Sequence, residues 1–319
     1  MSVGSASLPD AVLDRTVLGS YTRLGYALRS PHWNDSELRR MDGEVVIVTG
    51  ATSGLGEAAA AGFARLGATV WLVVRNVERG ERARARIAER TGHDELLVAT
   101  CDLSEMSSVR RFAREFTERS PRLDVLVNNA GLLTRERSLS ADGIELTLAI
   151  NVLGPFLLTT LLVPVLESSA PSRVINVSSG GMYTQGLHLD DLQSAEGRFR
   201  GAVAYSRSKR IEVVLTERWA QRLHGTGVVV NSMHPGWVDT PGLRDSLPAF
   251  RKLMRPLLRT AEQGADTIVW LGAAAPAGEL SGGFWLDHAR RPTHVLPWSG
   301  ESAADRERLW EAVRRLAGV

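Results

Sequence analysis

A strand, a glycine-rich turn and a helix follow one another near the start of this chain, and this unit constrains the fold most strongly. Residues 44–49 form a continuous, largely β-branched run, typical of a strand that is buried on both sheet faces. Gly50, Gly54 and Gly56 follow, and then an alanine-rich helix begins. Glycines at such a turn let the backbone approach a pyrophosphate at the helix N-terminus. We therefore expect a nucleotide to contact Thr49, Gly50, Ser53, Gly54, Leu55 and Gly56.

The alternation of strand and helix continues along the chain. Strands are predicted over 68–74, 96–100, 123–127, 173–177, 228–232 and 283–286. Helices are predicted over 77–90, 105–118, 143–166 and 261–271, and over a segment that contains Tyr205 and ends near Leu223. We expect the 143–166 helix to bend at Gly154-Pro155. The pattern predicts an α/β fold, a three-layer doubly wound parallel sheet of the Rossmann type in a single domain over 41–300.

The composition is that of an ordinary soluble protein. The 319 residues carry a formal net charge of +2, which gives no sign of a nucleic-acid partner. The single cysteine, Cys101, excludes an internal disulfide and is expected to be a buried apolar residue. The longest apolar run, 156–166, is too short to span a bilayer, and no secretory signal is present in the first thirty residues. The expected location is cytoplasmic.

The two ends of the chain lie outside the alternating pattern. In the N-terminal extension, 1–40, Leu13, Val17, Tyr21, Leu24 and Leu28 recur at helical spacing and predict one amphipathic helix that ends before Pro31. This helix could pack on its own domain, form a subunit contact, or lie on a membrane surface through residues 11–28. Residues 301–319 predict a C-terminal helix.

Tyr205 and Lys209 are the first candidate catalytic pair. Residues four apart on a helix share one face. A nearby ammonium favours the phenolate form of tyrosine, which makes the hydroxyl a usable acid or base. The chain has only two lysines, Lys209 and Lys252, among its 38 basic residues. A lysine kept at this position indicates a need for a compact ammonium rather than a planar guanidinium.

The end of the second predicted strand indicates the cofactor. An acidic residue there would accept hydrogen bonds from the ribose 2′-hydroxyl of NAD, whereas an arginine accommodates the 2′-phosphate of NADP. The strand ends Val73-Val74-Arg75-Asn76, without a carboxylate. We therefore predict NADP(H), with Arg75 on the 2′-phosphate; the alternative is a surface arginine.

These motifs together resemble the short-chain dehydrogenase/reductase (SDR) family, and in particular its branch of single-domain reductases that includes retinol dehydrogenases. The resemblance covers residues 41–290. It rests on the glycine turn, Asn128-Asn129-Ala130-Gly131 after the fourth strand, Asn151, Ser179, and Tyr205-x-x-x-Lys209, in the order and spacing of the family. It implies a dimer or tetramer built partly on the Tyr205 helix.

The resemblance also assigns roles in catalysis. It implies that Tyr205 transfers a proton to or from the substrate oxygen and that Ser179 hydrogen-bonds that oxygen, with Ser178 as the rival serine. It implies that Lys209 acts on Tyr205 and binds the nicotinamide ribose, and that Asn151 holds a water linked to Lys209. Further cofactor contacts are implied for Asp102, Leu103, Asn129, Ala130, Gly131, Pro235, Gly236 and Thr240. The alternative for Asp102 is a helix N-terminal carboxylate.

The histidines predict no metal site, because none has a spacing such as His-Glu-x-x-His. A structural role is expected for His234. The segment between His288 and His294 could close over the substrate or form a surface loop.

Three variable stretches are expected to form the substrate pocket: 180–201, 237–258 and the region after Asn129. The second is rich in large apolar residues, including Trp237, Phe250 and Leu253, which suits a lid over a lipophilic carbonyl or alcohol. The same residues could instead form a helix face that packs inward.

The predicted function is an NADP(H)-dependent oxidoreductase that interconverts a carbonyl and an alcohol. A cofactor-binding protein without turnover, acting as a redox sensor or scaffold, is the alternative from another class. Epimerases and dehydratases of nucleotide sugars are a further alternative, but they usually carry Gly-x-x-Gly-x-x-Gly and a larger C-terminal region, and neither is present here.

Overall fold

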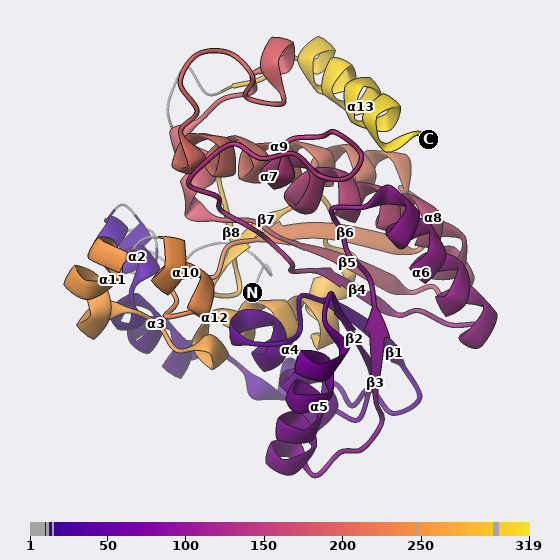
Figure 1. Cartoon of the computed structure of the whole chain (residues 1–319). Coiled ribbons are helices and arrows are strands. Elements are labelled where there is room, and N and C mark those ends of the chain that lie inside the picture. Colours follow the sequence, from indigo (N-terminus) through magenta and orange to yellow (C-terminus); the bar gives the residue numbers. More distant parts are fainter. Residues whose placement is uncertain (1–9, 11–12, 15, 247, 296–299) are drawn as a thin grey trace.

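The protein folds around one central sheet, seen in the computed structural model in Figure 1. The structure describes residues 10, 13–14, 16–246, 248–295 and 300–319. The strand order is β3-β2-β1-β4-β5-β6-β7-β8. The strands are β1 (Val45–Thr49), β2 (Thr69–Val74), β3 (Leu96–Thr100), β4 (Val125–Asn128), β5 (Ser172–Val177), β6 (Val228–Met233), β7 (Phe284–Leu286) and β8 (Ala289–Arg291). The predicted α/β fold with a doubly wound sheet is confirmed.

All neighbouring strands from β3 to β7 pair in parallel, and only β7 and β8 are antiparallel. The strand β8 was not expected. Its three residues contain two arginines and no apolar alternation, so they carry no strand signal of their own. The antiparallel pairing follows from a tight turn at Asp287 and His288, both with positive φ.

Helices cover both faces of the sheet, as Figure 1 shows. One face packs against α4 (Gly54–Arg65), α5 (Val77–Thr91) and α12 (Ala261–Ala273); the other packs against α6 (Met106–Arg119), α8 (Gly154–Ser168), α9 (Gly201–Arg222) and α13 (Ala303–Ala317). Successive strand side chains point to opposite faces. In β1, Val46 and Val48 therefore belong to the first core, whereas Ile47 belongs to the second.

The long central helix contains a π-helical turn just before Gly154-Pro155, and the bend predicted there stays a prediction. The helix runs through α7 (Leu146–Leu148), the π turn Ala149–Leu153 and α8, which begins at Gly154. The whole segment Leu146–Ser168 is long and apolar enough to cross a membrane, although 78% of its most apolar window is buried inside the protein. The segment is therefore a helix of the protein core. It is longer than the apolar run at 156–166 indicates.

The N-terminal segment does not form the single amphipathic helix predicted from its spacing. It forms α2 (Val17–Tyr21) and α3 (Arg23–Arg29), separated by Thr22, whose extended backbone and side chain cap α3. The break turns Leu18, Leu24 and Leu28 to the surface, each more than half exposed, and buries Gly25 and Arg29 instead. The end of the pattern before Pro31 is confirmed. The prediction that this segment packs on its own domain is confirmed, because Tyr21 contacts His234 and Trp237. A subunit contact and a membrane-surface role stay predictions, and 11, 12 and 15 lie outside the described residues.

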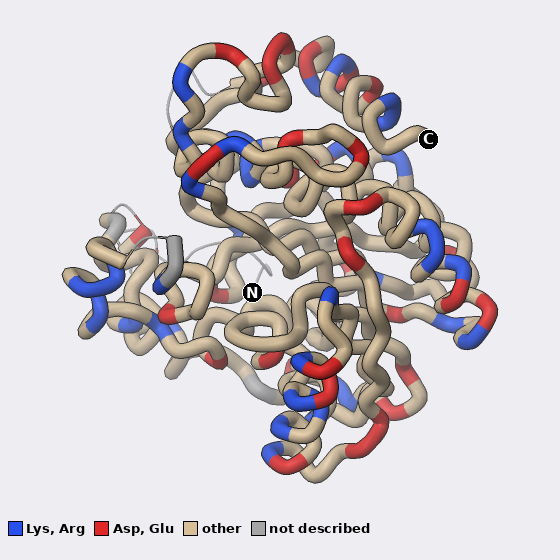
Figure 2. The backbone as a smooth tube through the Cα atoms, in the orientation of Figure 1, with Lys and Arg blue, Asp and Glu red and all other residues tan. Residues whose placement is uncertain are grey.

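The remaining elements are short. Two helices, α10 (Pro241–Ser246) and α11 (Pro248–Met254), lie beside α2 and α3 at the left edge of Figure 1. Single 3₁₀ turns span Ser30–His32, Asp35–Glu37, Gly180–Thr184, Leu189–Asp191, Arg255–Leu257 and Pro276–Glu279. Charges of both signs are interspersed along helices such as α5 and α13 in Figure 2, as the net charge of +2 suggests.

Candidate functional site

The glycine turn after β1 is held in a conformation that side chains would obstruct. Gly50 has φ +68°, and a Cβ there would lie 2.9 Å from the Cα of Ala130. A Cβ on Gly56 would lie 2.4 Å from the carbonyl oxygen of Gly50. Both positions therefore require glycine. The backbone of this turn can consequently approach a phosphate closely at the N-terminus of α4.

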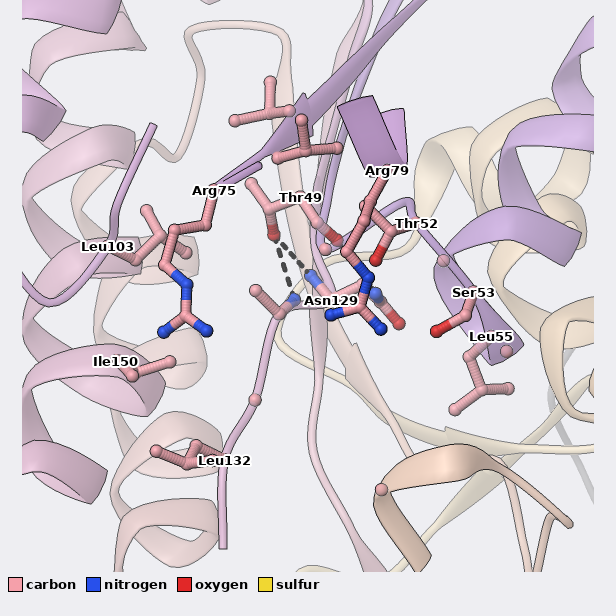
Figure 3. Close-up of a pocket in the computed structure, with 18 of the residues that line it drawn as sticks. Thr49, Thr52, Ser53, Leu55, Arg75, Arg79, Leu103, Asn129, Leu132 and Ile150 are labelled. Atoms are coloured by element: carbon pink, nitrogen blue, oxygen red, sulfur yellow. Dashed lines mark hydrogen bonds between the residues drawn. The ribbon is translucent and has the colours of Figure 1, made fainter. Parts of the chain in front are cut away.

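The ends of β1 and β4 are tied together beside this turn. The hydroxyl oxygen of Thr49 accepts hydrogen bonds from the backbone N–H groups of Asn129 (2.9 Å) and Ala130 (3.0 Å), drawn as dashed lines in Figure 3. The Asn129 side-chain amide donates to the Thr49 carbonyl oxygen at 2.8 Å. These bonds fix the floor of a cleft at the carboxyl ends of the strands, where ligands bind in open α/β sheets.

A cavity of about 380 Å³ opens above this floor. Among the predicted cofactor contacts, it is lined by Thr49, Gly50, Ser53, Gly54, Leu55, Gly56, Arg75, Asp102, Leu103, Asn129, Ala130, Gly131 and Thr240. Residues that sequence reasoning missed also line it, among them Thr52, Asn76, Arg79, Leu132 and Ile150. Arg79 adds a second guanidinium to that of Arg75, and Figure 3 shows both side chains reaching over the cavity.

The contact of Arg79 with the cavity could have been predicted from its position in the helix α5. Asn76 caps α5, and its side-chain oxygen accepts a hydrogen bond from the Arg79 N–H at 2.9 Å. Arg79 therefore stands in the first turn of the helix that follows β2, close to Arg75 at the strand end. Two cations at this end of the cavity favour an anionic group on the ligand.

A second cavity, of about 440 Å³, adjoins the first. Ser179, Tyr205, Lys209, Pro235 and Gly236 line it. Both cavities share Leu55, Asn129, Gly131, Leu132, Thr240 and Gly242. The fold therefore brings the predicted acid/base tyrosine, the serine and the lysine to one cavity, next to the glycine turn.

The two adjacent serines differ in what their hydroxyls contact. The Ser178 hydroxyl is buried and donates to the backbone carbonyl of Lys209 at 2.8 Å. The Ser179 oxygen accepts a hydrogen bond from the Gly181 N–H at 3.2 Å, so its own proton is not used by that bond. A substrate oxygen could therefore receive a hydrogen bond from Ser179, whereas Ser178 serves to hold α9 against β5.

Lys209 is fully buried and is held by two acceptors. Its ammonium donates to the Val177 carbonyl oxygen at 2.9 Å and to the Glu212 carboxylate at 2.7 Å, and it lies 5.6 Å from the ring centre of Tyr205. Burial acts to lower the pKa of Lys209, but the Glu212 carboxylate and Tyr205 outweigh it, so the pKa is raised. The lysine is therefore a cation beside Tyr205 at neutral pH.

Asn151 lies in the π turn, not in either large cavity. Its side-chain oxygen accepts from the Leu132 N–H at 2.8 Å, and its amide donates to the Leu132 carbonyl (3.0 Å) and to the Ser208 hydroxyl (2.9 Å). The side chain thus joins the segment after β4 to the catalytic helix α9. The predicted water-holding role of Asn151 stays a prediction.

Other candidate residues have structural partners. The Asp102 carboxylate accepts from the N–H and hydroxyl of Ser104 and so shapes the turn before α6. His234 is buried, its ring stacks on Phe284, and burial holds its pKa well below the usual value. Burial likewise raises the pKa of the Cys101 thiol to about 12, as expected for an unreactive buried cysteine.

The segment from His288 to His294 does not close over either cavity. His288 stacks between Trp33 and Trp270 and pairs with Asp266 at 2.5 Å. His294 contacts Arg210 and Glu301. The suggestion that this segment covers the substrate is wrong, because its residues line neither cavity. Its two histidines and Arg291 are bound to other parts of the protein. Among the described residues, no three His, Cys, Asp or Glu side chains group as a metal site would require.

The 237–258 stretch forms only part of a lid. Trp237, Val238, Leu243 and Phe250 line the second cavity, whereas Leu253 is 77% exposed and Leu258 is buried away from it. Leu247 lies outside the described residues. From the other two variable stretches, the cavity takes Gly181 and the residues 131–133.

The N-terminal segment packs against the backbone of the site. The Tyr21 ring packs edge-on against His234 (4.7 Å between ring centres) and lies so close to Gly180 that a Cβ there would be 2.9 Å from it. The Tyr21 carbonyl accepts a hydrogen bond from the Trp237 N–H at 2.7 Å. A segment far away in sequence thus braces the backbone next to Ser179 and Gly236.

Comparison with known proteins agrees with this geometry. The profile of the short chain dehydrogenase family matches residues 44–249. The chain is 43% identical over 303 residues to Dehydrogenase/reductase SDR family member 12 of Bos taurus, which covers 94% of this chain and 95% of the relative. It is 39% identical to Retinol dehydrogenase 12 of Homo sapiens over 88% of each chain.

A solved structure with a bound nucleotide also resembles this chain. The RhlG/NADP active-site complex of Pseudomonas aeruginosa has a TM-score of 0.63 and 28% identity, over 76% of this chain and 94% of that chain. The family profile covers well over half of the chain, and the relatives match along nearly its whole length. The chain therefore belongs to the short-chain dehydrogenase/reductase family.

Proposed function

We propose that this protein is an NADP(H)-dependent oxidoreductase that interconverts a carbonyl and an alcohol on a lipophilic substrate. The observation that carries the proposal is the meeting of Ser179, Tyr205 and Lys209 in one cavity that adjoins the glycine turn. An enzyme of this family takes its hydride chemistry from the nicotinamide, and the protein supplies position, hydrogen bonds and charge.

The residues present fit a dinucleotide. The backbone of the glycine turn can bind a pyrophosphate at the N-terminus of α4. The turn requires glycine, because a Cβ on Gly50 or Gly56 would clash with neighbouring backbone atoms. The preference for NADP(H) is supported by Arg75 and Arg79, which line the cavity beyond β2, and by the absence of a carboxylate within 73–76.

The chain's own residues handle the proton. In carbonyl reduction, Tyr205 gives its hydroxyl proton to the substrate oxygen as negative charge develops there, and the Ser179 hydroxyl donates a hydrogen bond to the same oxygen. In alcohol oxidation the same groups act in reverse. The Lys209 ammonium lies 5.6 Å from the centre of the Tyr205 ring, where its positive charge stabilises the negative charge that develops on the tyrosine oxygen during proton transfer.

The lipophilic substrate is supported by the second cavity and by the relatives. At about 440 Å³ it has the size of a small-molecule site. Its walls are mostly apolar and include Leu133, Val238, Leu243, Trp237 and Phe250. One relative is by name a retinol dehydrogenase.

Tyr205→Phe tests the proposal, with Tyr183→Phe as the control for losing a hydroxyl elsewhere. Tyr183 donates to the Pro292 carbonyl and does not line either cavity. We expect Tyr205→Phe to bind NADPH as the unmodified protein does and to lose at least about 100-fold in kcat, since proton transfer is typically worth that much. Full turnover by Tyr205→Phe would refute the mechanism; NADPH binding without turnover of any carbonyl by the unmodified protein would favour a scaffold role.

A further inference from the structure

A buried carboxylate lies next to Lys209, the lysine of the site. Glu212 lies three residues after Lys209 on the same face of α9, and its Oε1 accepts from the Lys209 ammonium at 2.7 Å. The two side chains are only 10% and 3% exposed. A buried charge is costly unless it is paired, so each of these groups depends on the other.

The second oxygen of Glu212 has a different environment. Glu212 Oε2 is buried without a hydrogen-bond partner from the described protein atoms. A small cavity of about 20 Å³ adjoins it, lined by the polar side chains of Asn151, Thr159 and Asn176 and by apolar groups. Such a volume and set of partners suit one water molecule. Glu212 is therefore placed between the ammonium on one side and a polar pocket on the other.

The ion pair changes its net charge near neutral pH. Burial raises the pKa of Glu212 to about 7, against the effect of the Lys209 ammonium, which lowers it. Lys209 itself stays protonated, as described above. The pair is thus neutral above this pH and carries one net positive charge below it.

The polar side chains that face Glu212 across the small cavity are uncharged. It faces Asn176 on β5, Thr159 on α8 and Asn151 in the π turn, and none of the residues that line the small cavity is titratable apart from Glu212 itself. On its own helix, Lys209 and Tyr205 are the titratable side chains coupled to the pair. The field at Tyr205 therefore depends on whether Glu212 is ionised.

We propose that Glu212 is a positioning residue for the oxidoreductase reaction described above: through its ion pair with Lys209 it sets the net charge next to Tyr205 and so the pH dependence of the reaction. When Glu212 is ionised, its charge offsets the ammonium. The net charge next to the Tyr205 hydroxyl is then close to zero, which favours donation of its proton to a carbonyl oxygen over the reverse transfer. The site is consequently adjusted for carbonyl reduction at neutral and mildly alkaline pH.

The first test is Glu212→Gln, which keeps the side-chain shape and removes the charge. With the Lys209 ammonium left uncompensated, we expect the pH profile of kcat for alcohol oxidation to shift to lower pH by about one unit. Glu301→Gln is the matched control, because Glu301 is the buried partner of Arg210, which follows Lys209 on α9. Glu301 lines neither the cavity at the glycine turn nor the cavity that contains Tyr205. Its profile should remain that of the unmodified protein. A Glu212→Gln protein that turns over with an unshifted profile would overturn the proposal.

A second test needs neither a variant nor turnover. The chain has two lysines, so labelling lysine with ¹³C at Cε gives one signal for Lys209 and one for exposed Lys252 on α11. We expect the Lys209 signal to titrate between about pH 6 and about pH 8, while the Lys252 signal stays constant there. A flat Lys209 signal would overturn the proposal. Because this readout is independent of catalysis, it separates failure of the ion-pair proposal from failure of the oxidoreductase function.

Discussion

The charged cluster that joins the N-terminal segment to the last two strands makes a sharp prediction about stability. Asp287 accepts from both terminal nitrogens of Arg259, at 2.6 and 2.8 Å, and from Arg29 at 2.9 Å. Arg259 also donates to the backbone carbonyls of Ser20 and Thr22. One carboxylate thus pairs with two buried guanidinium groups that hold the N-terminal segment in place, and Arg29 pairs with Asp10 as well.

Replacing this carboxylate with an amide should be costly. Asp287→Asn removes the carboxylate that pairs with the buried Arg259, while Arg29 keeps its pair with Asp10. Breaking a buried pair in this way typically costs about 3–5 kcal/mol. That is a large part of the roughly 5–15 kcal/mol by which a folded domain is stable. The backbone adds no further strain, because Asp287 has φ +54° and asparagine tolerates this region as well as aspartate does.

Equilibrium urea unfolding followed by tryptophan fluorescence would measure the effect. Asp42→Asn is the control, since the Asp42–Arg40 pair is exposed on both sides and should contribute little. We expect the midpoint of Asp287→Asn to fall well below that of Asp42→Asn. Equal midpoints for the two variants would refute the reasoning that this cluster holds the N-terminal segment in place.

Three further predictions concern ligand binding. Gly56→Ala places a Cβ 2.4 Å from the Gly50 carbonyl and should weaken NADPH binding at least about tenfold in calorimetry, since overpacking costs about 1–3 kcal/mol; unchanged affinity would contradict the glycine cradle. Arg75→Asp should shift the ratio of NADPH to NADH affinity toward NADH, and an unchanged ratio would argue against contact with the 2′-phosphate. Phe250→Ala should lower kcat/KM for a long-chain aldehyde about tenfold or more while sparing a small polar one, and equal losses would argue against an apolar substrate pocket.

Local patterns in the sequence were sufficient to predict the strands from β1 to β7, the glycine turn and the doubly wound parallel sheet. Most of the predicted strands are short apolar runs that contain β-branched residues, and the bounds of β3 agree with the prediction to the residue. Ser179 and Tyr205, which the sequence motifs indicated, line one cavity, since the carboxyl ends of parallel strands meet at one edge of the sheet.

Contacts between distant segments could not be predicted in the same way. The spacing of Leu24 and Leu28 suggested a buried seam, but the fold buries Arg29 because Asp287, 258 residues later, offers it a partner. Glu212 was missed because a carboxylate within a helix normally indicates a solvated face. Only the packing of α9 against β5 shows that it is buried with Lys209.

Cofactor titration followed by turnover tests the central claim most directly. The purified protein would be titrated with NADPH and with NADH, and NADPH oxidation would then be followed across a panel of lipophilic and small polar aldehydes and ketones. The account predicts tighter binding of NADPH than of NADH and turnover of lipophilic carbonyls. Tighter binding of NADH, or turnover confined to small polar carbonyls, would contradict it.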